Sequence, residues 1–78
     1  MPTLKYRNVI KILRNLGFTQ RTKRAGAHQT WTQKRGERTY YVTVSFHRAG
    51  QDVPKGTLSS MIRQSGYSKK EFYEALRR

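Results

Sequence analysis

Residues 39–46, Thr-Tyr-Tyr-Val-Thr-Val-Ser-Phe, decide the fold of this 78-residue chain. The stretch is rich in β-branched and aromatic residues, and its side chains alternate with the period of two that a half-buried strand requires. One face carries Tyr40, Val42, Val44 and Phe46, and the opposite face carries Tyr41, Thr43 and Ser45. Because the first face is apolar, we expect a β-strand that buries it and leaves the second face toward solvent.

Two further strands are expected before this one. Residues 28–34 also alternate, and the pattern does not decide which side Trp31 takes. One face carries His28, Thr30 and Thr32, and the other carries Gln29, Trp31 and Gln33. Residues 18–24 are short and polar, which suits an edge strand. Residues 25–27, Ala-Gly-Ala, predict a turn, and residues 35–37, Arg-Gly-Glu, predict a hairpin.

The N-terminal segment has helical spacing. Its apolar positions are Tyr6, Val9, Ile10, Leu13 and Leu16, and its opposite face carries Lys5, Arg7, Lys11 and Arg14. Thr3 is the expected N-cap, Gly17 the expected left-handed stop, and Phe18 is placed to pack on the last turn. The sequence therefore predicts an amphipathic helix with a cationic outer face.

Two helices are expected after the strong strand. Residues 47–56 contain glycine and proline and predict a loop. Thr57 is the expected N-cap of a helix that ends at Gly66 and contains the apolar residues Leu58, Met61 and Ile62. Ser68 and Glu71 form a capping box that opens a short last helix, whose inward residues are Phe72, Ala75 and Leu76.

The predicted order is helix, three strands, helix and a short terminal helix, in one domain over residues 1–78. Two helices covering one face of an antiparallel sheet bury the apolar surface of such a chain. The expected fold class is therefore α+β, with the layout of a double-stranded-RNA-binding domain.

Charge is the strongest functional signal. Seventeen Lys and Arg residues face four Asp and Glu residues, which gives a formal net charge of +13. Such an excess predicts a polyanionic partner, most often nucleic acid, with an acidic membrane or an acidic protein as alternatives. The chain has no cysteine and no apolar run long enough to span a membrane, so we expect a cytoplasmic protein.

The sequence lacks the residue patterns of most kinds of catalytic and cofactor-binding site. The four carboxylates, Glu37, Asp52, Glu71 and Glu74, are not spaced as metal ligands. A nucleophile elbow and a glycine-rich phosphate loop are also absent. We therefore expect no metal site and no small-molecule cofactor, which leaves histidines and cations.

RNA carries its own nucleophile, the 2′-hydroxyl, and its cleavage needs a proton carrier and positive charge. Histidine titrates near neutral pH and suits the first task. His28 directly follows the small-residue turn at 25–27, and Arg21, Lys23 and Arg24 precede it. His28 is therefore the candidate catalytic residue, although a histidine that only begins a strand fits the spacing too.

Other residues are expected to bind RNA without reacting. His47 ends the strongest strand, where it could contact phosphate, divide acid and base roles with His28, or simply end the strand. Tyr41 is the expected stacking residue, because it lies on the face opposite the core. The predicted RNA-binding residues are Arg21, Lys23, Arg24, Lys34, Tyr41, His47 and Lys55.

Gly26-Ala27-His28, followed by Trp31, resembles the Gly-Ser-His signature of HicA toxins. The order of further pieces is also similar: Leu16-Gly17-Phe18, residues 42–47, residues 54–58, residues 62–66 and Glu71-Phe72. The resemblance covers Lys5 to Phe72. The chain departs from the pattern at Ala27, where the family usually has serine, and at Gln29, where histidine or an apolar residue is common.

The resemblance implies a double-stranded-RNA-binding-like fold, cleavage of mRNA independent of the ribosome, and neutralisation by a HicB antitoxin in a type II toxin–antitoxin system. It also implies that His28 is catalytic. Ala27 removes a hydroxyl that could hold a phosphate or orient the imidazole. Two other functions remain open at this stage: a non-catalytic RNA-binding module, and a protein whose basic face only docks an acidic antitoxin.

Overall fold

The computed structural model describes residues 4–21, 28–45, 48 and 50–77. The chain forms α1 (Tyr6–Leu16), β1 (Thr19–Gln20), β2 (His28–Arg35), β3 (Arg38–Ser45), α2 (Lys55–Ser65), α3 (Lys69–Glu74) and the 3-10 turn η1 (Ala75–Arg77). The strands form one antiparallel sheet in the order β1-β2-β3. The expected α+β class and its resemblance to a double-stranded-RNA-binding domain are confirmed.

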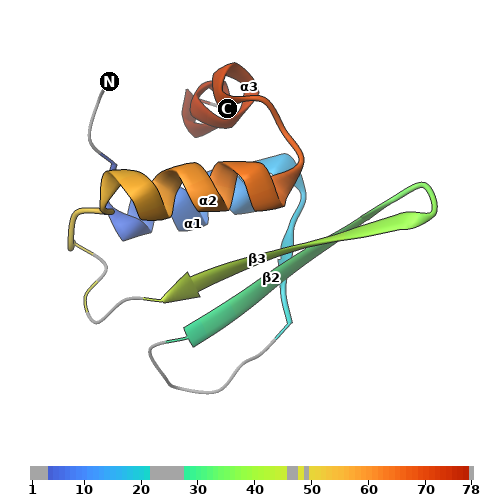
Figure 1. Ribbon diagram of the computed structural model, residues 1–78, viewed down its shortest axis with the longest axis horizontal. Helices are drawn as coiled ribbons and strands as arrows, with labels where there is room; N and C mark the ends of the chain where they lie inside the picture. Colours follow the sequence, from blue (N-terminus) through green and yellow to red (C-terminus); the bar gives the residue numbers. More distant parts are fainter. Residues whose placement is uncertain (1–3, 22–27, 46–47, 49, 78) are drawn as a thin grey trace.

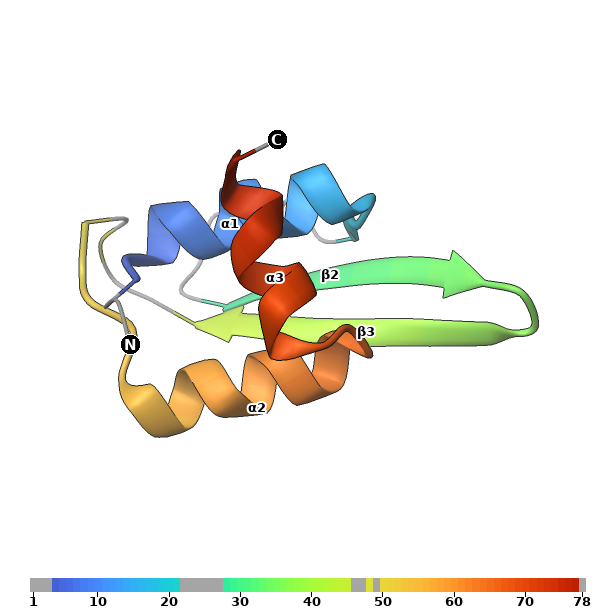
Figure 2. The same cartoon turned by 90° about the horizontal axis from the view of Figure 1, so that it is seen from above.

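All the helices lie on one side of the sheet (Figure 1). Seen from above, α1 and α2 flank the strands and α3 lies across the space between them (Figure 2). The core lies between these layers and consists of Leu4, Tyr6, Val9, Ile12, Leu13, Leu16, Phe18, Trp31, Val42, Val44, Val53, Leu58, Met61, Phe72 and Ala75. Among the helices that the structure describes, none is long and apolar enough to cross a membrane.

The register of the sheet settles the side of Trp31. Trp31 pairs with Val42, and both are buried, at 2% and 0% exposure. Side chains of paired residues share a face. Trp31 therefore lies against the helices with Val42 and Val44, and Tyr41 lies on the other face, as predicted.

The turn between β2 and β3 has two residues, whereas the sequence pattern predicted a turn over the three residues 35–37. Arg35 is the last residue of β2, and the turn consists of Gly36 and Glu37 alone. Gly36 has φ 62, and no described residue other than glycine has positive φ. A glycine at the first of two central positions, with positive φ only there, is typical of a type II′ hairpin.

The end of β2 next to the hairpin turn is hydrogen-bonded to the C-terminal ends of both long helices, α1 and α2. Gln33 donates from Nε2 to the carbonyl of Leu16 at 2.7 Å, at the end of α1. Arg35 donates to the carbonyl of Ser65 at the end of α2, and its guanidinium carbon lies 3.7 Å and 4.2 Å from the ring centroids of Tyr40 and Tyr67. A cation near helix carbonyls is favourable because the C-terminal end of the helix dipole is negative.

Both predicted glycine stops are confirmed, since Gly17 and Gly66 adopt left-handed conformations with φ 99 and 75. The capping box is also confirmed: Ser68 accepts from the Glu71 N–H, and Glu71 accepts from the Ser68 N–H, each at 3.1 Å.

Several predicted boundaries are wrong. The first helix begins at Tyr6, because Asn8 Oδ1 accepts from the Lys5 N–H at 2.9 Å and supplies the cap. Thr3, the expected cap, lies outside the described residues. Thr57 does not cap the second helix: α2 begins at Lys55 with Pro54 as N-cap, so the predicted loop over 47–56 ends two residues early.

The shortest strand and the first helix differ in detail as well. Of the predicted strand at 18–24, β1 covers Thr19 and Gln20, Phe18 and Arg21 lie outside it, and residues 22–24 lie outside the described part of the chain. Ile12 is fully buried, whereas Ile10, which was predicted for the core face, is only partly buried. The turn at 25–27 and Phe46 lie outside the described residues.

Candidate nucleic-acid interface

The face of the sheet that the helices leave uncovered is polar. Its residues come from alternate positions of the three strands. Residues that pair with one another across the strands form a row perpendicular to them, which we call a rank. Thr32 of β2 pairs with Tyr41 of β3 and with Thr19 of β1, and the Thr30–Thr43 pair forms the next rank. Lys34 and Thr39 form the rank nearest the hairpin. We call this surface, formed by Thr19, Arg21, Thr30, Thr32, Lys34, Thr39, Tyr41, Thr43 and Ser45, the outer sheet face.

Arg21 extends this surface beyond the end of β1. Its backbone N–H donates to the carbonyl of Thr30 at 2.8 Å, which continues the β1–β2 register by one residue. Arg21 is exposed. It therefore belongs to the rank of Thr30 and Thr43, as the register predicts for a residue two positions after Thr19.

The backbone of His28 begins β2 and pairs with Ser45, the last residue of β3. This pair is the rank next to Arg21, Thr30 and Thr43. Because successive residues in a strand rise by about 3.4 Å, neighbouring ranks are roughly 7 Å apart. The rank of Tyr41 is thus roughly 14 Å from the His28–Ser45 pair, and that of Lys34 roughly 20 Å.

Tyr41 is 49% exposed, and it is the one large hydrophobic residue classed as exposed in the described part of the chain. Hydroxyl-bearing residues surround its position: Thr32 beside it, and Thr39 and Thr43 before and after it on the same face. Hydroxyls donate and accept hydrogen bonds, so they can contact phosphate oxygens or ribose hydroxyls. An aromatic ring among them offers a stacking surface to a base.

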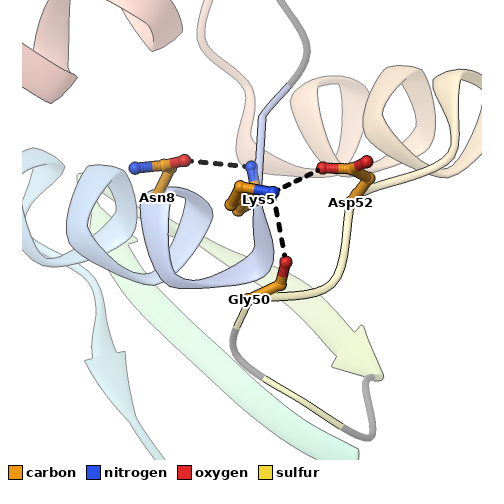
Figure 3. A network of polar contacts seen from close by, with 4 residues as sticks. All are labelled: Lys5, Asn8, Gly50 and Asp52. Atoms are coloured by element: carbon orange, nitrogen blue, oxygen red, sulfur yellow. Dashed lines mark hydrogen bonds and ion pairs between the residues drawn. The ribbon is translucent and has the colours of Figure 1, made fainter.

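The described residues of the outer sheet face include no carboxylate. Asp52 is elsewhere, paired with Lys5, whose Nζ lies 3.0 Å from Asp52 Oδ1 (Figure 3). Glu71 caps α3, Glu74 is the last residue of that helix, and Glu37 is in the hairpin turn. Lys34 and Arg21 thus face solvent without a neighbouring acidic residue on their own face, which favours an anionic ligand.

The segment after β3 is fixed to the start of α1. The N–H of Tyr6 donates to Gln51, and the N–H of Val53 donates to Leu4, at 3.0 Å and 2.9 Å. Lys5 reinforces this contact through Asp52 and the carbonyl of Gly50 (Figure 3). A hollow of about 450 Å³ lies here, lined by Arg48, Gly50, Gln51 and Asp52.

The predicted site residues are thus only partly brought together. Arg21, Lys34 and Tyr41 share the outer sheet face, but only Arg21 is in the rank next to the backbone of His28. Lys55 is exposed but belongs to the first turn of α2, in the helical layer, at the end of the molecule where β2 begins (Figure 1). Lys23, Arg24 and His47 lie outside the described residues.

Sequence reasoning missed the row of hydroxyls formed by Thr30, Thr32 and Thr43. The alternation of β2 and β3 could have found it once the side of Trp31 was known. Within the described ranges, no group of three or more His, Cys, Asp or Glu residues could hold a metal ion.

The chain matches a known protein family. The family described as the HicA toxin of bacterial toxin–antitoxin matches residues 6–67 of the chain. That range includes the sheet, α1, α2 and all the residues of the outer sheet face. No curated protein matches the chain significantly.

Proposed function

The chain belongs to the HicA toxin family of bacterial toxin–antitoxin systems, and from that premise we propose that it is an endoribonuclease that cuts mRNA without a metal ion. A toxin of such a system has an antitoxin partner, which we propose to be of HicB type. With mRNA as its substrate, the protein acts in the cytoplasm. RNA lies on the outer sheet face, and His28 is the catalytic residue.

The observation that carries this proposal is the register of β2 against β3. In this register the backbone of His28 is one rank from Arg21. His28 is also in phase with Thr30, Thr32 and Lys34, since these are every second residue of β2. A proton carrier next to a cation is what cleavage of a ribose-phosphate requires. The same face offers hydroxyls and one exposed aromatic ring, which suits a flexible polyanion with bases.

In the proposed reaction the 2′-hydroxyl attacks the adjacent phosphorus, and its proton passes to the imidazole of His28. The bond from phosphorus to the 5′ oxygen of the next nucleotide breaks, and that oxygen takes up a proton. The products are a 2′,3′-cyclic phosphate and a 5′-hydroxyl. Arg21 and Arg24 stabilise the negative charge that develops on the phosphorane oxygens.

The remaining contacts bind and orient the RNA. Tyr41 stacks on a base two ranks from the reacting phosphate, and Lys34 neutralises a phosphate one rank further on. Lys55, in the first turn of α2, adds a phosphate contact, and Lys23 and His47 are proposed to add others. The substrate in this proposal is single-stranded RNA, because a base must be unstacked from its neighbours to lie on the ring of Tyr41.

The reaction is tested with an RNA oligonucleotide in excess EDTA, beside an oligonucleotide with one 2′-deoxyribose at the preferred cleavage position. We expect cleavage of the first, with cyclic phosphate ends, and none at the substituted bond of the second. Cleavage at the substituted bond would show that water is the nucleophile. Binding of both RNAs with no cleavage of either would support the alternative, a non-catalytic RNA-binding module.

A further inference from the structure

β3 is an edge strand whose outer edge carries free backbone groups. The sheet order β1-β2-β3 leaves one side of β3 unpaired by any described strand. In a hairpin with a two-residue turn, the pair that flanks the turn, Arg35 and Arg38, is hydrogen-bonded, and every second pair after it is too. The N–H and C=O groups that point away from β2 therefore belong to Thr39, Tyr41, Thr43 and Ser45.

One of these groups has a substitute partner. The N–H of Thr43 donates to Oε1 of Gln64, a side chain of α2, at 3.2 Å. Within the described ranges, the N–H groups of Tyr41 and Ser45 have no such partner. Gln64 thus occupies the middle of an otherwise open edge, in the place where the carbonyl of a fourth strand would accept.

The side of α2 that carries Gln64 lies next to this edge. Figure 2 shows α2 alongside β3, on the side away from β2. Thr57 and Ser60 are spaced to share a helical stripe with Gln64, and all three are exposed. Gln64 is the residue of this stripe whose side chain accepts from the β3 backbone, so it is the side chain that an added strand must displace.

Within its own sequence the edge lacks the usual protection against pairing, so α2 and Gln64 are what protects it. Natural edge strands carry lysine, proline or bulges that discourage a further strand. Residues 39–45 contain no proline and no charged residue. Arg38, at one end of the edge, is an exposed cation.

We propose that the edge of β3 binds one extended segment of the antitoxin by β-strand addition, with an acidic residue in that segment facing Arg38, and that Gln64 is displaced when it binds. The proposal rests on the family membership, which supplies the antitoxin. A second copy of the chain fits poorly, because each copy carries a net charge of +13. Alternating N–H and C=O groups match a polypeptide backbone better than RNA.

Such a segment also lies beside Tyr41, which belongs both to the edge strand and to the outer sheet face. Antitoxin bound at the edge therefore crowds the position proposed for a base. In this way one added strand both holds the toxin and competes with its substrate.

The first test is amide hydrogen exchange, measured by NMR on the isotope-labelled chain with and without the separately purified cognate antitoxin. We expect exchange at Tyr41 and Ser45 to slow at least about ten-fold in the complex, because each N–H gains a backbone acceptor. Val42 and Val44, which already bond to β2, serve as internal controls. A complex that forms while Tyr41 and Ser45 exchange as in the free chain overturns the proposal.

The second test is Thr43→Pro beside Thr43→Ala. The Thr43 N–H points away from β2, so proline there leaves the β2–β3 ladder intact while blocking the edge. We expect Thr43→Pro to weaken antitoxin binding at least about ten-fold and Thr43→Ala to change it by less than about three-fold. Equal affinities in a folded Thr43→Pro variant would contradict edge docking; if that variant does not fold, the exchange measurement on the unaltered chain decides.

One further outcome separates this proposal from the alternative occupant. If the free chain forms a dimer that Thr43→Pro abolishes, the edge serves a second copy of the chain and the proposal fails. RNA cleavage by the free chain is measured separately from antitoxin binding. If the free chain does not cleave RNA, the antitoxin-binding result still tests edge docking. If edge docking fails, the cleavage result still tests the nuclease proposal.

Discussion

Trp31 of β2 is paired with Val42 of β3, and both side chains are buried beneath the helices. This one pair fixes which face of the sheet is buried. Since residues alternate along a strand, it also fixes Thr30, Thr32, Tyr41 and Thr43 on the uncovered face. The packing of the core and the composition of the proposed RNA surface are thus set by the same register.

Replacing Trp31 should therefore destabilise the whole domain. We expect Trp31→Ala to lower the free energy of unfolding by about 3–5 kcal/mol, because it removes a large buried ring and leaves a cavity. Trp31→Phe should cost clearly less. Urea denaturation followed by circular dichroism measures both, and a loss below about 1 kcal/mol for Trp31→Ala would contradict the described core.

Tyr41 should affect RNA binding without affecting the fold, because its ring faces solvent. We expect Tyr41→Ala to weaken binding of single-stranded RNA by about 1–3 kcal/mol, which is roughly 5- to 150-fold in Kd. Tyr41→Phe keeps the stacking ring and should bind nearly as well as the parent. Fluorescence anisotropy gives both values; equal losses for the two variants would point to the hydroxyl instead of the ring.

The salt dependence of binding tests which basic surface meets the phosphates. Lys34→Gln should make the log–log salt slope for single-stranded RNA shallower by about 0.7, the contribution of one phosphate contact. Lys69→Gln, an exposed lysine of α3, should leave the slope unchanged. A larger change for Lys11→Gln on α1 than for Lys34→Gln would assign the RNA to the helical side and contradict the proposal.

Gly66 and Gly36 form a matched pair for testing the hairpin's attachment to the helices. Both have positive φ, so alanine strains either position, by about 1–2 kcal/mol. A Cβ at Gly66 would also collide with Arg35 and Tyr40, whereas one at Gly36 meets nothing within 4 Å. We expect Gly66→Ala to lower stability by about 1–3 kcal/mol more than Gly36→Ala. Similar melting temperatures for the two variants would show that the side chains of Arg35 and Tyr40 move aside at little cost in stability.

Much of the fold is predictable from local patterns in the sequence. The alternation of residues 39–45, the glycines at 17 and 66, and the Ser68–Glu71 box each act within a few residues of themselves, and each is confirmed. Tyr41 is on the predicted face for the same reason. The face of Trp31 was not predictable from its own strand, because only pairing with Val42 decides it.

Some errors arise where contacts are distant in sequence, and others where local backbone bonding starts a helix before the residue with the more typical capping side chain. Lys5 pairs with Asp52 and bridges to its backbone, which helps to set where α1 begins, and nothing near Lys5 indicates this. Gln64 reaches Thr43 from another element in the same way. α2 begins at Lys55 because the carbonyl of Pro54 already accepts from the Leu58 N–H at 2.9 Å, although Thr57 has the more typical capping side chain.

The most direct test of the nuclease account is the single-turnover rate of RNA cleavage by His28→Ala, at saturating protein and in excess EDTA, with the affinity for uncleavable RNA measured on the same preparation. Loss of a proton-transferring residue predicts a rate about 10²- to 10⁴-fold below that of the parent, with the affinity nearly unchanged. A variant that binds equally well and cuts as fast as the parent would contradict the central claim.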